Sequence, residues 1–101
     1  NSTLGLTMHF AIFCLDKPGI KRDPDVMKAH VDYLAKSPIN NVMSGPLTND
    51  DGKGVIGSLY IVEADSREAV DAFRKDDPLV QADYWELVEV RAFDKRVDNR
   101  N

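Results

Sequence analysis

The amino-acid sequence predicts a small α+β domain built on a four-stranded antiparallel sheet. Apolar residues alternate with a period of two in four segments, and they recur every three to four residues in two others. These segments follow one another in the order strand, helix, strand, strand, helix, strand. Since this is the order of a ferredoxin-like fold, we expect both helices to cover the same face of the sheet.

The first strand and the first helix are separated by a change of period. Residues 8–15 (MHFAIFCL) are rich in aromatic and branched side chains and end at the turn cluster DKPG, which is typical of a strand. Asp23 followed by Pro24 predicts a capped helix start, and the apolar stripe then runs to the Ser-Pro pair that begins at Ser37. We therefore expect a strand and then a helix.

Two further strands are predicted on either side of a polar turn. The segment NNVMSGPL predicts a second strand that ends at Gly45 and Pro46, because glycine and proline interrupt strands. The polar segment TNDDGKG predicts the turn, and VIGSLYIVEA (55–64) predicts the third strand. The two strands should form a hairpin with an irregular loop.

The second helix is predicted to begin at a capping box made by Asp65 and Glu68. Its apolar face follows at Ala69, Val70 and Phe73, and KDDP ends it. We expect the linking stretch LVQADYW to form a single turn. The alternating segment ELVEVRAF then predicts the fourth strand.

Length and charge bear on domain organisation and on the class of partner. We expect one domain over residues 8–96, an N-terminal arm or cloning remnant over 1–7, and a C-terminal tail over 97–101. The net charge of −4 and the scattered basic residues argue against nucleic acid as a partner. No apolar run approaches the roughly 20 residues of a membrane span, so we expect no membrane partner either.

The cysteine and histidine content bears on location and cofactors. Cys14 is the single cysteine, which excludes an internal disulfide and favours a reducing cytoplasm. With His9 and His30 it lacks the short paired spacings of zinc sites, and the chain has no glycine-rich nucleotide motif. We expect neither a metal nor another cofactor.

Both faces of the predicted sheet are apolar. Residues 10–15 and 59–62 each place apolar side chains on the two faces alternately. The helices can cover only one of these faces. A second copy of the chain, packed sheet against sheet, best explains the other, and a few tolerated surface hydrophobic residues are the alternative. We therefore expect a homodimer.

His30 is the first candidate site residue. In a helix it shares a stripe with Val26, Tyr33 and Leu34, so it should face the core. A buried imidazole needs a hydrogen-bond partner, whether the ring is structural or part of a working site.

The predicted topology offers this histidine two carboxylates. Right-handed crossovers bring five segments to one end of the fold: DKPG, the first turns of the first helix, SGP, GS and DDP. The partner should therefore be Asp76 or Asp77. Asp77 is favoured, because the residue before a proline leaves the helical region and turns its side chain toward the neighbouring helix.

A carboxylate that holds a histidine fixes its tautomer and raises its basicity, as a general base requires. The alternative is a structural pair that satisfies a buried ring without catalysis. Ser58, in the GS opening of the third strand, can add a hydroxyl to such a site or can simply pack where a large side chain cannot. Tyr33, Tyr84 and Trp85 are interpreted as core or interface aromatic residues.

Taken together, the segments DKPG, AHVDYL, SGPL, IGSLYIVEA and DDP resemble the YciI-like family of the dimeric α+β barrel superfamily. The resemblance runs from Met8 to about Phe93. It maps the family's histidine and aspartate onto His30 and Asp77. Leu79 stands where an aromatic residue commonly follows Asp-Pro, and Asp83 where glycine is usual.

This resemblance implies a homodimer and a pocket with a His-Asp pair. Members have been linked to lyase or dehydrochlorinase chemistry on chlorinated hydroxyaromatic compounds. The implied reaction is a cofactor-free proton abstraction, with His30 as base, Asp77 as its orienter, and Ser58 with backbone N–H groups stabilising an oxyanion. The alternative is a non-catalytic module that binds an unknown small ligand or joins a larger enzyme.

Overall fold

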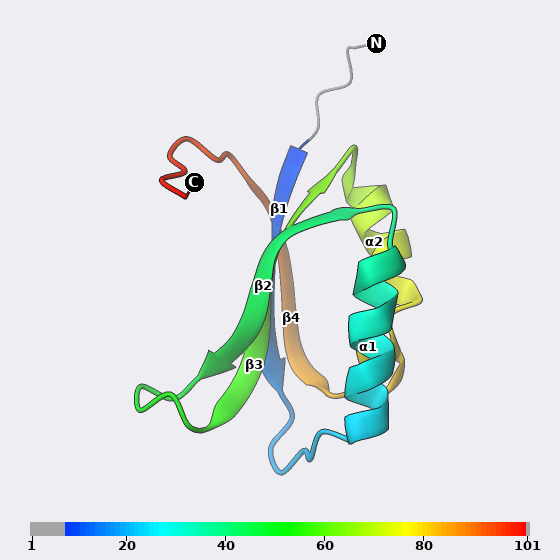
Figure 1. The fold of residues 1–101 in the computed structure, drawn as a ribbon, viewed down its shortest axis with the longest axis vertical. Coiled ribbons are helices and arrows are strands. Elements are labelled where there is room, and N and C mark those ends of the chain that lie inside the picture. Colours follow the sequence, from blue (N-terminus) through cyan, green and yellow to red (C-terminus); the bar gives the residue numbers. More distant parts are fainter. Residues whose placement is uncertain (1–7, 101) are drawn as a thin grey trace.

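The computed structural model describes residues 8–100, so the predicted arm at 1–7 lies outside the described residues. The elements in chain order are β1 (Met8–Asp16), α1 (Pro24–Lys36), β2 (Asn40–Thr48), β3 (Val55–Ala64), α2 (Arg67–Lys75), α3 (Pro78–Gln81) and β4 (Trp85–Phe93). The sheet order is β2-β3-β1-β4, and every adjacent pair is antiparallel. Figure 1 shows the helices together on one side of the sheet, which confirms the predicted ferredoxin-like α+β fold.

The two longer helices begin at side-chain caps, one of which differs from the prediction. α1 follows Asp23 as expected. α2 is instead capped by Ser66, whose hydroxyl accepts a hydrogen bond from the Ala69 N–H at 3.1 Å. The predicted capping box of Asp65 and Glu68 is therefore wrong by one residue. Ser66 is extended and directly precedes the helix, so its short side chain reaches the free N–H groups of the first turn.

β2 runs through the point at which the sequence predicts its end. The strand continues to Thr48, and Pro46 lies opposite Ser58 of β3. Proline has no N–H to donate, but β2 is an edge strand that pairs with β3 alone. The prediction that β2 ends at Gly45 and Pro46 is therefore wrong, because an edge position tolerates proline.

The core lies between the sheet and the helices. On β1, the side chains of Phe10, Ile12 and Cys14 are each no more than 2% exposed. The opposite face of the sheet is also apolar, with Met43 at 47% and Leu87 at 39% exposure. Within residues 8–100, no helix is long and apolar enough to cross a membrane.

Candidate functional site

His30 and Asp77 meet beneath the helices. His30 lies in the middle of α1 and is 6% exposed, and Asp77 is 3% exposed. The His30 Nδ1 lies 2.7 Å from Asp77 Oδ1. Since a carboxylate can only accept, the His30 Nδ1–H is the donor. The structure thus brings together the two residues that the sequence pairs.

The local backbone explains why Asp77 rather than Asp76 reaches the ring. Asp77 is extended, with φ −71° and ψ 126°, as expected for the residue before Pro78. It also caps α3, because the Leu79 N–H donates to the same Oδ1 at 2.9 Å. Asp76 instead ends α2 as its C-cap. The expected single turn is thus the short helix α3, and two donors hold the Asp77 carboxylate in place.

Tyr60 completes a chain of three buried polar side chains. With the proton on Nδ1, the lone pair of His30 is on Nε2, which lies 3.3 Å from the Tyr60 hydroxyl. The two rings meet edge to face, with centroids 5.9 Å apart. The sequence analysis did not assign Tyr60 to the site, because it alternates like the other inward residues of β3. The available signal was its position two residues after Ser58, on the same face of the strand.

Burial and charge keep the Tyr60 hydroxyl protonated. Burial raises the pKa of Tyr60, and the Asp77 carboxylate raises it further, while a hydrogen bond with Ser58 lowers it. Ser58 is itself buried and lies beside the Tyr60 hydroxyl. Gly57, just before it, has no room for a side chain, since a Cβ there would collide with the Cys14 carbonyl oxygen. This close approach of β3 to β1 sets the position of Ser58.

A cavity of about 230 Å³ opens beside these residues. Its polar lining comes from Arg22, His30, Ser44 and Ser58, and its apolar lining from Met27, Gly45, Pro46, Val55, Tyr60 and Leu79. For scale, an engineered cavity of about 150 Å³ holds benzene. The cavity therefore has the size of a molecule with one ring, and residues from SGP and GS lie on its wall.

Arg22 is a second residue that the sequence analysis did not single out. It lies in the loop between β1 and α1, where an arginine carries no recognisable motif. Its guanidinium lies over the Trp85 ring, with 5.3 Å between the guanidinium carbon and the ring centroid. Trp85 therefore packs as the buried aromatic residue that the sequence predicts, and it also supports Arg22.

The remaining candidate ligands lie apart from one another. No group of three or more His, Cys, Asp or Glu side chains suited to a metal occurs in the part of the chain that the structure describes. The Cys14 thiol is buried, and desolvation raises its pKa to about 11. His9 lies on the open face of the sheet, where its Nε2 is 3.5 Å from Glu63.

Comparison with solved structures gives the fold several relatives. The 5-chloro-2-hydroxyhydroquinone dehydrochlorinase TftG of Burkholderia phenoliruptrix, in complex with 2,5-dihydroxybenzoquinone, is 29% identical. Its TM-score is 0.72, over 86% of this chain and 94% of the dehydrochlorinase. A hypothetical Arabidopsis thaliana protein (11% identity, TM-score 0.52, coverage 93% and 92%) shares the fold. So does the hydroxynitrile lyase of Passiflora edulis (10% identity, TM-score 0.50, coverage 93% and 99%).

Comparison with sequences gives the family. A search of curated proteins found no significant match. The family model of the YCII-related domain, however, matches residues 8–94, which is most of the chain. The resemblance drawn from DKPG, AHVDYL and DDP is confirmed, and this chain belongs to the YCII-related domain family.

Proposed function

We propose that this protein is a cofactor-independent enzyme that removes a proton from a small hydroxylated substrate, with His30 as the general base. One observation carries the proposal. The buried imidazole of His30 lines a cavity, its Nδ1–H donates to a carboxylate, and its Nε2 has a longer contact, 3.3 Å, with the Tyr60 hydroxyl. A histidine that only satisfied the core would be enclosed on both sides.

The proposed step moves one proton and one electron pair. Nε2 accepts the proton of a substrate hydroxyl or acidic carbon, and the electron pair collects on a substrate oxygen. Asp77 stabilises the imidazolium ion that forms. Once Nε2 carries the proton it no longer accepts from Tyr60, so the Tyr60 hydroxyl joins the Ser58 hydroxyl and nearby backbone N–H groups in stabilising the oxyanion. In an elimination the electron pair then expels a leaving group such as chloride, and in an isomerisation the proton returns to another atom.

The similarity to the Burkholderia dehydrochlorinase supports this type of substrate. That protein shares 29% of its residues with this chain and acts on a chlorinated hydroxyhydroquinone. Its bound dihydroxybenzoquinone has one ring, the size that a cavity of about 230 Å³ suits. We therefore favour lyase, isomerase or dehydrochlorinase chemistry on a hydroxylated ring compound.

Release of chloride from 5-chloro-2-hydroxyhydroquinone tests the proposal. The wild type and the matched control His9→Asn should release chloride, and His30→Asn should be slower by about 100-fold or more, as is usual for loss of a general base. An unchlorinated hydroxyhydroquinone in D₂O provides a second assay, in which ring protons exchange. If the wild type is inactive in both assays, the enzyme proposal is wrong and a small-ligand-binding or accessory module replaces it.

We further propose that the protein works as a homodimer whose open sheet faces pack together. On this face Phe13 lies opposite Leu59, and Leu15 lies opposite Leu87, so apolar side chains form rows across three strands. A second copy would remove these rows from water. A standard interface needs about 800 Å² from each partner, which one face of a small sheet can supply.

A further inference from the structure

We propose that Arg22 holds the oxygen on which negative charge collects, and that the substrate is a neutral molecule with an acidic phenolic or enolic hydroxyl. This inference rests on the proposed function, because it takes His30 as the base. It adds a residue to the site and a chemical class to the ligand.

Arg22 is fixed in the wall of the cavity that His30 also lines. Its Nη2 donates to Asp16 Oδ1 at 2.8 Å, and its guanidinium lies over the Trp85 ring. The Arg22 and Asp16 side chains are only 17% and 13% exposed. A planar charge held in this way keeps a fixed direction, unlike an arginine on the solvated surface.

The guanidinium has donors to spare. Nη2 serves Asp16 and, at 3.4 Å, the Gly57 carbonyl oxygen. Nη1 lies 3.9 Å from the Met27 Sδ, a weak acceptor. Nε is buried and has no partner among residues 8–100. Because Nη1 has only this weak acceptor and Nε has none, the guanidinium is incompletely satisfied, and Nη1, beside the cavity-lining Met27, favours an oxygen that enters the cavity.

The charges around the cavity decide which kind of oxygen fits. Arg22 already balances Asp16, and Asp77 adds a second carboxylate beside His30. Among the residues that line the cavity, Arg22 carries the formal charge and Asp16 already balances it, so a ligand that arrives as a carboxylate gives up its hydration for a site with no net positive charge. A neutral hydroxyl compound avoids this cost. Its proton passes to Nε2, and its oxyanion then forms beside the imidazolium and the guanidinium.

Three nitrobenzene probes test this assignment: 4-nitrophenol, whose phenolate absorbs visible light, its methyl ether 4-nitroanisole, and 4-nitrobenzoate. The wild type should bind 4-nitrophenol with a higher phenolate fraction than the free probe has at the same pH. It should bind 4-nitrobenzoate most weakly. Arg22→Gln should lower the ratio of phenolate to phenol in the complex about tenfold, as loss of one charge-assisted hydrogen bond predicts. The affinity for 4-nitroanisole should not change.

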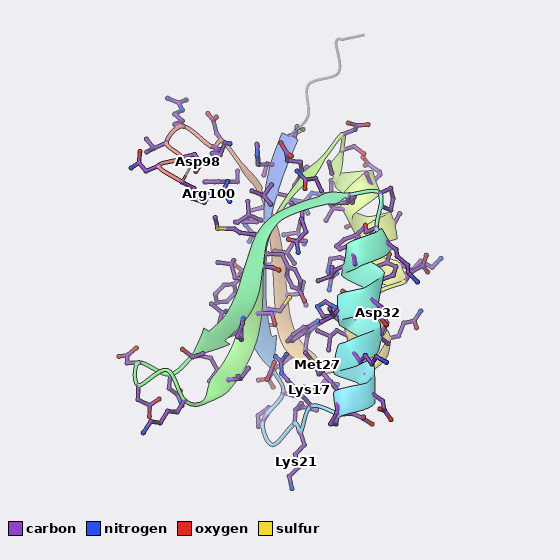
Figure 2. All side chains as sticks on the ribbon, in the orientation of Figure 1. Lys17, Lys21, Met27, Asp32, Asp98 and Arg100 are labelled. Atoms are coloured by element: carbon purple, nitrogen blue, oxygen red, sulfur yellow. The ribbon has the colours of Figure 1, made fainter. Side chains whose placement is uncertain are left out.

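Lys21→Gln is the matched control. It removes the same charge one residue away, from a side chain that points into solvent (Figure 2). Met27, which lines the cavity, lies on the sheet side of α1 in the same view. This variant should leave the phenolate ratio unchanged. The assignment is overturned if the wild type does not raise the phenolate fraction, if Arg22→Gln leaves it unchanged, or if 4-nitroanisole loses as much affinity as 4-nitrophenol. Binding of 4-nitrobenzoate as tight as that of 4-nitrophenol overturns the substrate class.

Two further variants keep the test decisive. Should Arg22→Gln fail to fold because Asp16 loses its partner, the double variant Asp16→Asn with Arg22→Gln removes both charges and is judged by the same criteria. His30→Asn separates this inference from the proposed function. A phenolate ratio that falls in Arg22→Gln but not in His30→Asn keeps Arg22 and refutes the base. The reverse pattern refutes Arg22 and keeps the base.

Discussion

Both histidines of this chain lie beside a carboxylate, but the two pairs differ in the properties on which chemistry depends. His30 contacts Asp77 at 2.7 Å beneath the helices, and its other nitrogen faces Tyr60 and a cavity. His9 lies 3.5 Å from Glu63 on the open face, in a side-chain pair that is 15% and 31% exposed. A contact between histidine and carboxylate becomes a candidate site where burial is joined to a cavity that the imidazole ring lines.

The largest expected effect is on dimer formation, and it comes from substitutions on the open face that carries His9. Met43→Glu combined with Leu87→Glu would place one charge on each of the two edge strands of the open face, within the proposed interface. We expect the dimer dissociation constant to rise by at least about 100-fold, since buried unpaired charges at an interface cost several kcal/mol. Light scattering over a dilution series measures the mass.

Val31→Glu is the control for this pair of changes, because Val31 is exposed on α1, away from the open face. It should leave the mass unchanged, and all three proteins should keep the His30 cavity. A wild type that has only the monomer mass at micromolar concentration contradicts the homodimer proposal.

The next largest effect is on the free energy of unfolding, and it compares the two carboxylates that contact histidines, Asp77 and Glu63. Asp77→Ala leaves the buried Nδ1–H of His30 without an acceptor and removes the cap of α3. We expect the free energy of unfolding to fall by about 3 kcal/mol. Glu63→Ala removes a partly exposed contact with His9 and an exposed hydrogen bond from the Asn40 side-chain amide, and should cost less than about 1 kcal/mol. Urea unfolding measures both values, and equal losses would show that burial does not distinguish the two pairs.

Alkaline pH should lower the free energy of unfolding through two groups that are buried between the sheet and the helices. Burial raises the pKa of Cys14 to about 11, and burial also raises the pKa of Tyr60. Both groups hold their protons more tightly in the folded chain than in the unfolded chain. Their contribution to stability is therefore complete below the unfolded-state pKa of the thiol, about 8.5, and is lost as the pH rises from there through the folded-state values.

We expect the free energy of unfolding to fall by about 1 to 2 kcal/mol between about pH 8.5 and pH 10.5, measured by urea titration. Cys14→Ala should reduce this pH dependence, because it removes one of the two groups. A pH dependence that is the same in the wild type and in Cys14→Ala would assign the whole effect to other residues.

The pairing of His30 with Asp77 could be predicted because simple rules fix both ends of it. Helical spacing turns His30 inward, strand order brings α2 beside α1, and Pro78 forces Asp77 out of the helix. Each rule depends on residues near in sequence or on the order of elements. The sequence contains both kinds of information.

The other cavity residues depend on packing that no such rule describes. Tyr60 alternates like a core residue, and its place in the site follows from the position of His30 Nε2 beside its hydroxyl. Arg22 lies in a loop, and its direction is set by Asp16 and by Trp85, from the far end of the chain. Pro46 predicts the end of a strand, and only the sheet order shows that β2 is at the edge, where proline is tolerated. In each case the role of the residue is set by a contact with residues far away in the sequence, and the local sequence does not encode such a contact.

The smallest expected effect concerns Asp83, in the segment that leads from α3 to β4. Its φ is 60°, in the left-handed region where residues other than glycine are strained, and glycine is usual there in the family that the sequence resembles. Its carboxylate pairs with Lys17 at 2.6 Å, but this pair is exposed and should be worth well under 1 kcal/mol. Asp83→Gly should therefore raise the free energy of unfolding by about 0.5 kcal/mol. The backbone strain that it relieves costs more free energy than the variant loses through the ion pair and through the greater freedom of glycine in the unfolded chain.

Thermal unfolding of Asp83→Gly measures this balance, with Lys17→Met as the control that removes the ion pair and keeps the backbone. The Lys17 backbone N–H also donates to the Tyr84 carbonyl at 2.8 Å, a bond that both variants retain. This segment positions Trp85 under Arg22, so it belongs to the His30 region rather than to the open face. A loss of stability in Asp83→Gly as large as that in Lys17→Met would mean that the ion pair, and not the backbone, holds the segment in place.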